Sequence, residues 1–316
     1  MMRRGLLLLA ALLASTAHAG PLSFGLFGDT PYTHWERQQL PELIGEMDRE
    51  DLAFVIHDGD IKNGGDECSD AAFRDILGVF RNSVHPLIYV PGDNEWTDCH
   101  RRSNGGYDPL ERLGRLRQMF FADDHALGQR KLRLERQSKD PAYSDYRENV
   151  RWEAGGVLFV GMNLPGSNNN YHGTGRSGPV AEYLARRAAN SAWLTQAFAM
   201  ARERKLAGLL LVIQGNPGFH SANAGRPNAG YAEFLDQLRD ETLAFPGQVV
   251  LVHGDTHQYR VDQPMKHPET EQAIGNFTRV ETPGSPFFAW VKATVDPSRP
   301  RLFHFEQRIF RRPVLD

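Results

Sequence analysis

The chain has 316 residues, of which 41% are hydrophobic and 24% are charged, and its formal net charge at pH 7 is -3. A chain of this length can bury a large hydrophobic core, and α/β proteins of this size commonly do so as one domain. The negative charge argues against general nucleic-acid binding. Beyond the N-terminal segment, no apolar run is long enough to cross a membrane.

The first 19 residues have the pattern of an export signal. The pair Arg3–Arg4 precedes an apolar run at 6–13 that is too short to span a bilayer, and the small-residue pattern Ala17–Ala19 follows it. We therefore expect a signal peptide over 1–19 that is cleaved after Ala19, and a single domain over 20–316. The mature protein is expected to be periplasmic or extracellular, without a stable membrane anchor. The paired arginines leave the twin-arginine route open, although general secretion is favoured.

Strand and helix patterns alternate over residues 22–120. Apolar runs end at Asp29, Asp60 and Asp93, and each is followed by a helical pattern. Such repeats imply right-handed crossovers and mainly parallel strands. The three helices are expected over residues 35–50, 69–82 and 108–120.

The middle of the chain contains a further strand and a long helix. Residues 121–150 are polar and weakly patterned, and the run WEAGGVLFVGMN at 152–163 indicates a strand. A helix is expected over 180–205, because apolar residues recur there at helical spacing. These residues are Ala189, Trp193, Ala197 and Met200.

The last third of the chain returns to strands. Two strand-and-loop units are expected at 208–218 and 248–257, with a helix over 231–243 between them. Residues 277–310 alternate apolar and polar side chains over several runs, which is typical of antiparallel strands.

Two cysteines, Cys68 and Cys99, lie in the connections that follow Asp60 and Asp93. Both connections leave the same edge of what should be neighbouring strands. An exported chain meets an oxidising compartment, so we expect a disulfide between these loops. Two independent free thiols are the alternative.

Five apolar runs end in polar side chains. LSFGLFGD ends on Asp29, LAFVIHDGD on Asp60, PLIYVPGD on Asp93, LLLVIQGN on Gln214 and Asn216, and VVLVHGDTH on Asp255 and His257. Each run is typical of a strand that is buried on both faces. Open α/β sheets bind ligands at the carboxyl ends of their strands, so oxygen-rich side chains there indicate a site for cations and anionic substrates.

The carboxylates of this set need positive charge to stay ionised together. Like charges at short range raise each other's pKa, and bound metal is the simplest compensation. Two divalent ions about 3.5 Å apart would polarise a phosphoryl group and lower the pKa of a water molecule. The alternative for any single Asp or Asn is that it caps a helix or forms a turn.

The order of these motifs resembles the calcineurin-like metallophosphoesterase superfamily. The blocks GD, GD, PGDNE, QGNP and HGDTH run from Phe27 to His257, in the order of the family pattern DxH, GDxxD, GNH[DE], H and GHxH. The resemblance implies a four-layer αββα sandwich. It also implies a metal-dependent phosphoric ester hydrolase.

The first three blocks match the family pattern with replacements. Asp29 matches the first aspartate, but Pro31 stands where the family has a histidine. Asp60 matches the aspartate that bridges two metals. In PGDNEW, Asp93 stands at the metal-binding asparagine, and Asn94 stands at the histidine that acts near the leaving group.

The last two blocks also carry replacements. Gln214 stands at the fourth-block histidine, Asp255 replaces the first histidine of GHxH, and His257 retains the second. The resemblance therefore implies two groups of metal ligands. The first ligand group is Asp29, Asp60 and His257, and the second ligand group is Asp60, Asp93, Gln214 and Asp255.

We expect one or two divalent metal ions as the cofactor. The second ligand group offers only oxygen donors, which favours Mg²⁺, Mn²⁺ or Ca²⁺ over Fe or Zn. The first ligand group has lost a histidine. A hard cation is therefore expected in the second group, and the first group should bind weakly or stay empty.

The expected function is an exported phosphoesterase acting on a small phosphomonoester or phosphodiester. Asp60 and Asn94 are the expected catalytic residues, and Asn94, His100 and Arg101 are expected to bind substrate, because Arg is well shaped for phosphate. The alternative is a weakened or inactive protein on the same scaffold that binds a cation or a phosphorylated or polyol ligand. The sequence carries no signal for the oligomeric state.

Asn94 cannot act as a general acid, although it can donate a hydrogen bond. A histidine elsewhere could take that role. The candidates are His57, His100, His172, His220 and His253. For His57 and His253, which precede ligands on their strands, a buried supporting role is the alternative.

Overall fold

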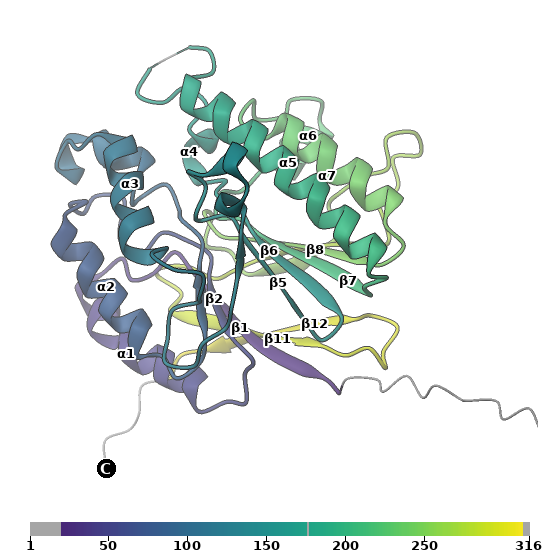
Figure 1. Ribbon diagram of the computed structural model, residues 1–316, viewed down its shortest axis with the longest axis horizontal. Helices are drawn as coiled ribbons and strands as arrows, with labels where there is room; N and C mark the ends of the chain where they lie inside the picture. The colour runs from purple at the N-terminus through teal and green to yellow at the C-terminus, as the bar shows by residue number, and fades with distance from the viewer. Residues whose placement is uncertain (1–19, 176, 312–316) are drawn as a thin grey trace, which may run out of the picture.

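Two β-sheets pack face to face at the centre of the structure, and helices cover their outer faces (Figure 1). The computed structural model describes residues 20–175 and 177–311. The expected signal peptide, residues 1–19, lies outside the described residues. The layers run helix, sheet, sheet, helix, which confirms the predicted four-layer αββα sandwich.

The first sheet combines the N-terminal strands with the C-terminal hairpin. Its strands are β1 (Leu22–Phe27), β2 (Val55–His57), β3 (Leu87–Tyr89), β11 (Ala289–Val295) and β12 (Phe303–Ile309). The strand order is β12-β11-β1-β2-β3. β1, β2 and β3 are parallel, whereas β11 is antiparallel to both β1 and β12.

Three helices follow β1, β2 and β3 and pack on this sheet. They are α1 (His34–Asp48), α2 (Asp70–Asn82) and α3 (Pro109–Phe120), close to the predicted ranges. Each helix begins at a polar residue, namely Thr33, Ser69 or Asp108, whose side chain accepts a hydrogen bond from the backbone N–H three residues later. Such caps contribute about 1 kcal/mol each, so the helix starts were readable from the sequence.

The second sheet has seven strands, in the order β4-β5-β6-β7-β8-β10-β9. They are β4 (Glu135–Arg136), β5 (Val150–Ala154), β6 (Val157–Gly161), β7 (Gly208–Val212), β8 (Gln248–His253), β9 (Arg260–Asp262) and β10 (Phe277–Glu281). The remaining α-helices are α4 (Gly166–Asn169), α5 (Ala181–Glu203), α6 (Phe219–Asn223) and α7 (Ala232–Ala244). The 3₁₀ helices are η1 (Thr97–His100), η2 (Arg102–Asn104), η3 (Gln137–Lys139) and η4 (Pro141–Tyr143).

One strand prediction was wrong, and another was confirmed in part. The run at 152–163 is not one strand, because the chain reverses at Gly155 and Gly156 and forms the antiparallel hairpin of β5 and β6. Both glycines have positive φ, which suits the tight reversal. In the tail, β11 and β12 are antiparallel as predicted, and β10 is antiparallel to β9. On its other side β10 runs parallel to β8, which the long connection between them allows.

The core between the two sheets is rich in aromatic rings. Phe159 of β6 lies 5.2 Å from Phe24 and 4.9 Å from Phe54, measured between ring centroids. Aromatic pairs of this kind add about 0.5–1.5 kcal/mol each beyond area burial. This packing holds the sheets together so that their loops meet at one edge. Over the described ranges, no helix has the length and apolar character needed to cross a membrane.

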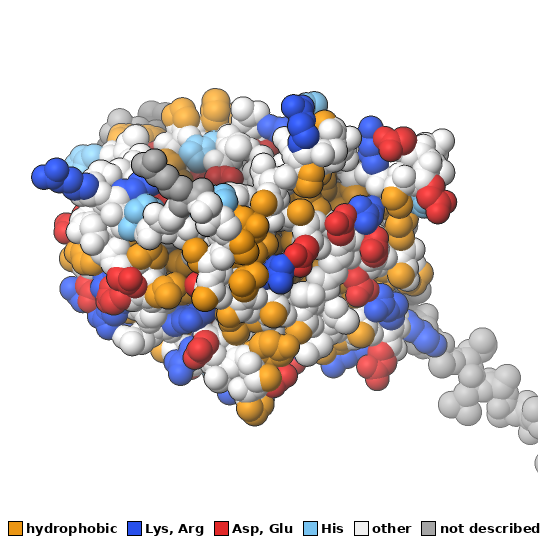
Figure 2. All heavy atoms as spheres, turned by 90° about the horizontal axis from the view of Figure 1, so that it is seen from above, with side chains coloured by type: hydrophobic (Ala, Val, Ile, Leu, Met, Phe, Trp, Pro, Cys, Tyr) orange, Lys and Arg blue, Asp and Glu red, His pale blue; other side chains and the backbone are white. Residues whose placement is uncertain are grey.

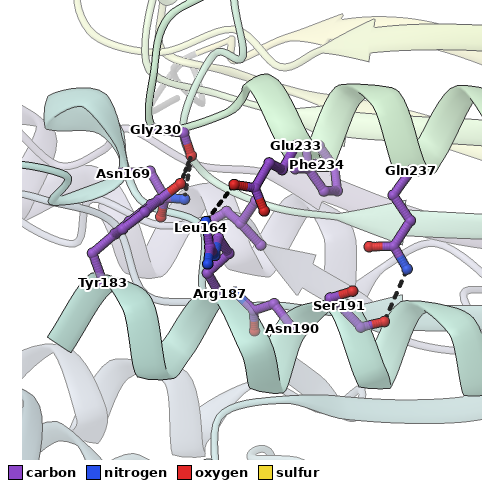
Figure 3. Close-up of a pocket in the computed structure, with 10 residues that line it drawn as sticks. All are labelled: Leu164, Asn169, Tyr183, Arg187, Asn190, Ser191, Gly230, Glu233, Phe234 and Gln237. Carbon is purple, nitrogen blue, oxygen red and sulfur yellow. Dashed lines mark hydrogen bonds and ion pairs between the residues drawn. The ribbon is translucent and has the colours of Figure 1, made fainter. Parts of the chain in front are cut away.

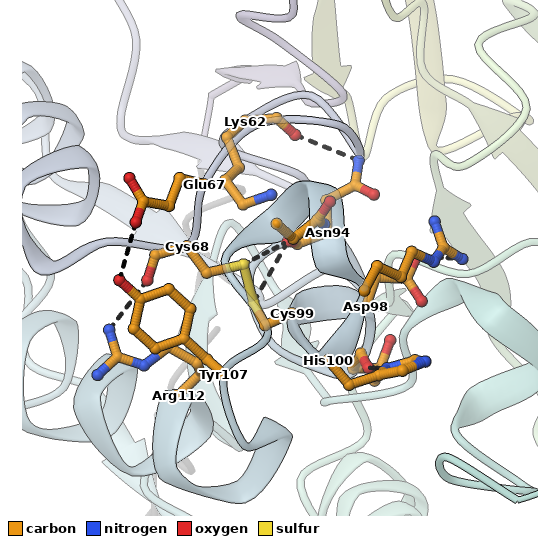
Figure 4. Close-up of a disulfide and its surroundings, with 12 residues drawn as sticks. Lys62, Glu67, Cys68, Asn94, Asp98, Cys99, His100, Tyr107 and Arg112 are labelled. Carbon is orange, nitrogen blue, oxygen red and sulfur yellow. Dashed lines mark hydrogen bonds and ion pairs between the residues drawn. A yellow bond between two sulfur atoms is a disulfide. The ribbon is translucent and has the colours of Figure 1, made fainter.

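The structure contains the predicted disulfide between the loops that follow β2 and β3 (Figure 4). Cys68 and Cys99 are buried, and their Cα atoms are 5.8 Å apart. The two sulfur atoms lie 3.4 and 3.7 Å from the carbonyl oxygen of Asn94. The disulfide therefore supports the loop that carries Asn94.

Replacing both cysteines, as Cys68→Ala with Cys99→Ala, should lower the free energy of unfolding by about 3 kcal/mol. The bond closes a loop with a sequence separation of 31 residues, so its loss increases the entropy of the unfolded chain. Urea denaturation measures the effect. Reductant should lower the unfolding midpoint of the wild type and leave that of the double variant unchanged. Equal midpoints for the oxidised and reduced wild type would contradict the prediction.

Candidate functional site

The polar residues that end the strands of both sheets meet at one edge of the molecule. Asp29, which follows β1, accepts a hydrogen bond from the backbone N–H of Asp255 at 2.9 Å. Its Oδ1 atom lies 3.4 Å from Gln214 Nε2 and 3.5 Å from His257 Nε2. These three partners follow β7 and β8 in the second sheet. Asp29 therefore joins the two sheets at their carboxyl ends.

Asp60 is buried and accepts hydrogen bonds on both carboxylate oxygens. Its Oδ1 atom accepts from the backbone N–H of Asn94 at 3.0 Å. Its Oδ2 atom accepts from the Asn94 side-chain amide and from the Tyr32 hydroxyl, each at 2.7 Å. The Asn94 amide nitrogen also lies 3.2 Å from the carbonyl oxygen of Lys62. The amide of Asn94 thus points inward and holds Asp60 in place.

Four of the predicted ligands have left-handed backbone conformations. The φ angles are 47° at Asp29, 58° at Asp60, 74° at Asp255 and 59° at His257. Such angles are uncommon outside glycine and cluster at functional sites. The close approach of the two sheets also requires Gly254, since a Cβ atom there would lie 2.0 Å from Asp29 Oδ2. The backbone is therefore shaped around these carboxylates.

A left-handed turn after β6 covers Asp93 and Asp255. Residues 167–170 all have φ between 49° and 54°. The Ser167 hydroxyl donates to Asp93 Oδ2 at 2.7 Å. A Cβ atom on Gly166 would lie 2.7 Å from an Asp255 oxygen and 2.8 Å from an Asp93 oxygen. The backbone at Gly166 therefore passes directly over both carboxylates and brings them near each other.

Asp98 links this cluster to Arg101. Its Oδ1 atom lies 2.9 Å from the Ser167 hydroxyl, and its Oδ2 atom lies 2.7 Å from Arg101 Nη2. The Arg101 side chain is 48% exposed, so its guanidinium is presented at the surface beside the cluster. His100 is also exposed, and its Nδ1 atom lies 2.8 Å from the carbonyl oxygen of Thr97. Among the described residues, no hydrogen bond joins His100 to the carboxylates.

Burial and mutual repulsion raise the pKa values of the Asp60, Asp93 and Asp255 carboxyls. Burial, followed by the charges of Asp255 and Asp98, raises the pKa of Asp93 to about 8. Burial also raises the pKa of Asp255 to about 6. The pKa of Asp60 is raised well above its ordinary value by burial and by the charge of Asp93. A positive charge at this edge would stabilise the ionised carboxylates.

His257 is the basic member of the predicted ligand set. Burial lowers its pKa, but the hydrogen bond to Asp29 and the charge of Asp29 outweigh burial, so the net pKa is raised. Its Nδ1 atom lies 2.6 Å from the carbonyl oxygen of Ser285. This contact leaves Nε2 directed at Asp29.

The two ligand groups differ in how well they suit a cation. Among the described residues, no group of three or more His, Cys, Asp or Glu side chains is arranged so that it could hold a metal ion. In the first ligand group, the Tyr32 hydroxyl lies 2.7 Å from Asp60 and 3.4 Å from Asp29. The second ligand group offers only oxygen donors, the atom type that hard cations prefer. Gln214 Oε1 already accepts from the backbone N–H of Gly166 at 2.5 Å.

The other candidate histidines lie outside this cluster. His57 and His253 are fully buried, and burial lowers the pKa of each to about 4. Their rings bond to backbone carbonyl groups at 3.1 and 2.9 Å, which suits a supporting role. Figure 2 shows several histidine side chains on the left half of the face seen from above and others to the right of its centre. His172 bonds to a loop carbonyl at 3.1 Å, and His220 is exposed.

Three residues of the site were missed in the sequence, namely Tyr32, Asp98 and Ser167. Tyr32 follows Asp29 in the short motif GDTPY, and Asp98 follows PGDNEW, so their closeness to predicted ligands was a usable signal. Ser167 lies in a loop far along the chain from Asp93. The packing of the second sheet, which contains β6, against the first sheet, which contains β3, brings it to the site.

A separate cavity of about 360 Å³ lies between α5 and α7 (Figure 3). Tyr183 and Arg187 line it from α5, and Glu233 lines it from α7 and pairs with Arg187. Leu164 and Asn169, from the segment after β6, form its inner wall. The cavity therefore adjoins the back of the segment that covers Asp93.

No protein-family model and no curated protein sequence matches this chain. Solved structures match its fold at low sequence identity. A dimetal phosphatase from Danio rerio is 12% identical with a TM-score of 0.59, and the match covers 91% of this chain and 96% of that one. A PhoD structure is 12% identical with a TM-score of 0.53, and the match covers 92% of this chain and 69% of that one.

The purple acid phosphatase PPD1 from yellow lupin, Lupinus luteus, is also similar. It is 11% identical with a TM-score of 0.52, and the match covers 92% of this chain and 54% of that one. These matches agree with the motif order and with the layered architecture. The chain therefore has the calcineurin-like metallophosphoesterase fold.

Proposed function

We propose that this chain is an exported, metal-dependent phosphoesterase that hydrolyses a small phosphomonoester or phosphodiester. The observation that carries the proposal is the buried acidic cluster at the carboxyl ends of the strands. Asp60, Asp93 and Asp255 have raised pKa values because they are buried close together. A bound cation would offset their repulsion. The dimetal phosphatase that shares the fold is consistent with this function.

The second ligand group would hold the cation. Its oxygen donors suit Mg²⁺, Mn²⁺ or Ca²⁺ better than Fe or Zn. Such an ion supplies the charge that polarises a phosphoryl group and lowers the pKa of water. Within this group, the hydrogen bonds from Asn94 fix the orientation of Asp60, so we assign Asn94 first to positioning.

Arg101 is the residue we assign to the phosphoryl oxygens of the substrate. Its exposed guanidinium is held beside the cluster by Asp98, and Arg binds phosphate with paired hydrogen bonds. His100 lies next to it in the chain and is exposed. We assign His100 a secondary contact with the same substrate.

A non-catalytic binding protein is the second candidate. The contact that favours it is the hydrogen bond from the Tyr32 hydroxyl to Asp60 at 2.7 Å. This bond and those from Asn94 satisfy Asp60 without a metal ion. In this case the site would bind a cation weakly, or would bind a phosphorylated or polyol ligand without turnover.

Export is part of the proposal and has a direct test. When the full chain is expressed in a bacterium, the protein should lose residues 1–19 and begin at Gly20. Mass spectrometry of the periplasmic and cytoplasmic fractions measures the N-terminus. A periplasmic protein that retains Met1 would contradict the predicted cleavage.

The activity prediction concerns Asp60, the residue shared by both ligand groups. After treatment with chelator, the mature protein should regain turnover of chromogenic phosphomonoesters or phosphodiesters when Mg²⁺, Mn²⁺ or Ca²⁺ is added. Asp60→Asn should reduce this turnover by roughly 100-fold or more, because a charged ligand is lost. Initial rates with each ion measure the effect.

Asp66→Asn is the matched control, because Asp66 is exposed in the same loop. It should keep the activity of the wild type. If no ion restores turnover while calorimetry still detects cation binding, the non-catalytic candidate is correct. Turnover that survives Asp60→Asn would refute the assignment of the site.

Without metal, stability should fall as the pH rises from about 4 to about 8. The pKa of an unfolded Asp is about 3.9, whereas the folded protein raises the pKa of Asp93 to about 8. Between these values the folded state keeps a proton that the unfolded state has lost. This contribution to stability is complete below the unfolded pKa and disappears as the pH passes the folded pKa.

Thermal unfolding in the presence of chelator, recorded across this pH range, measures the effect. The stability of the Asp93→Asn variant should fall less over this pH range, because the asparagine side chain does not titrate. The stability of Asp66→Asn should depend on pH as steeply as that of the wild type. If the stability of Asp93→Asn depended on pH as steeply as that of the wild type, groups other than Asp93 would cause the pH dependence.

A further inference from the structure

We infer that Tyr32 keeps a cation out of the first ligand group, so that this chain binds a single ion. The inference rests on the proposed function, because it takes the second ligand group to be a cation site. Tyr32 has no counterpart in the family pattern described above. Its role follows from three sets of contacts, which involve its hydroxyl group, its backbone and its ring.

The Tyr32 hydroxyl lies against the two carboxylates of the first ligand group. Its oxygen is 2.7 Å from Asp60 Oδ2 and 3.4 Å from Asp29 Oδ1. A hard cation held by these same oxygens would lie about 2.0–2.6 Å from each. Because the hydroxyl already contacts both oxygens, an ion reaches them only by displacing it.

The hydroxyl is also fully hydrogen bonded where it lies. It donates to Asp60 Oδ2 and accepts from the Asn94 amide at 2.9 Å. Asp60 in turn receives two further hydrogen bonds from Asn94. Displacing Tyr32 would therefore break one hydrogen bond to the buried Asp60 carboxylate and one from the Asn94 amide.

The backbone and ring of Tyr32 are fixed as well. Its backbone N–H donates to Glu36 Oε2 at 2.6 Å, within the first turn of α1. Its ring packs edge-on against His257, with the ring centroids 5.2 Å apart. Tyr32 thus contacts all three members of the first ligand group and cannot swing away without losing several contacts.

The test is to count bound ions after Tyr32→Phe, which removes the hydroxyl and keeps the ring. The mature protein is stripped with chelator, refilled with Mn²⁺, and measured by calorimetry and elemental analysis. Bound Mn²⁺ should rise from about one ion per chain in the wild type to about two in Tyr32→Phe. Adding Asp29→Asn to Tyr32→Phe should return the count to about one and so locate the extra ion.

Tyr143→Phe is the matched control, since the ring of Tyr143 packs on Tyr146. It should bind as many ions as the wild type. A Tyr32→Phe variant that binds one ion overturns the inference, and one that binds none shows that Tyr32 is itself a ligand. Both outcomes leave the proposed function standing. A wild type that binds two ions also overturns the inference alone, whereas a wild type that binds none overturns the inference and the proposed function together.

Discussion

The structure depends on the burial of several carboxylates where two sheets end together. Burying ionised groups without compensation is costly, and the cost grows as the groups approach one another. The chain meets this cost with backbone N–H groups, two amide side chains and two hydroxyl groups that donate hydrogen bonds. The packing of the sheets, the left-handed turns and the glycines at strand ends all serve this arrangement.

Two amide side chains, Asn94 and Gln214, stand where the motif resemblance predicts histidines. A neutral histidine can bind a soft or borderline metal through nitrogen, whereas Asn94 and Gln214 offer amide groups that also donate hydrogen bonds. In this structure Asn94 donates to Asp60, and Gln214 donates to Asp29. Of these two residues, Gln214 belongs to the predicted ligand set and Asn94 does not, and both amides add internal hydrogen bonds to the cluster.

The fold was predictable because its signals are local. Buried strands and glycine-bounded loops each occupy a few neighbouring residues, and the motif order supplied the architecture. The carboxylates near Asp29 were predictable for the same reason. The contacts of Ser167 and Tyr32 were not, because they depend on distances across the fold and on side-chain direction. The hairpin at Gly155 was missed because two short strands were taken as one continuous apolar run.

Because of the disulfide, the structure of the site depends on the redox state of the compartment that contains the protein. The Cys68–Cys99 bond lies under the carbonyl group of Asn94 and ties the loop after Asp60 to the loop after Asp93. In a reducing compartment both cysteines would be thiols, and these loops would be held only by noncovalent contacts, namely hydrogen bonds and hydrophobic packing. The loops around Asp60 are then joined covalently only after the two cysteines have been oxidised. A chain with reduced cysteines would carry every site residue and still lack the covalent bond between these loops.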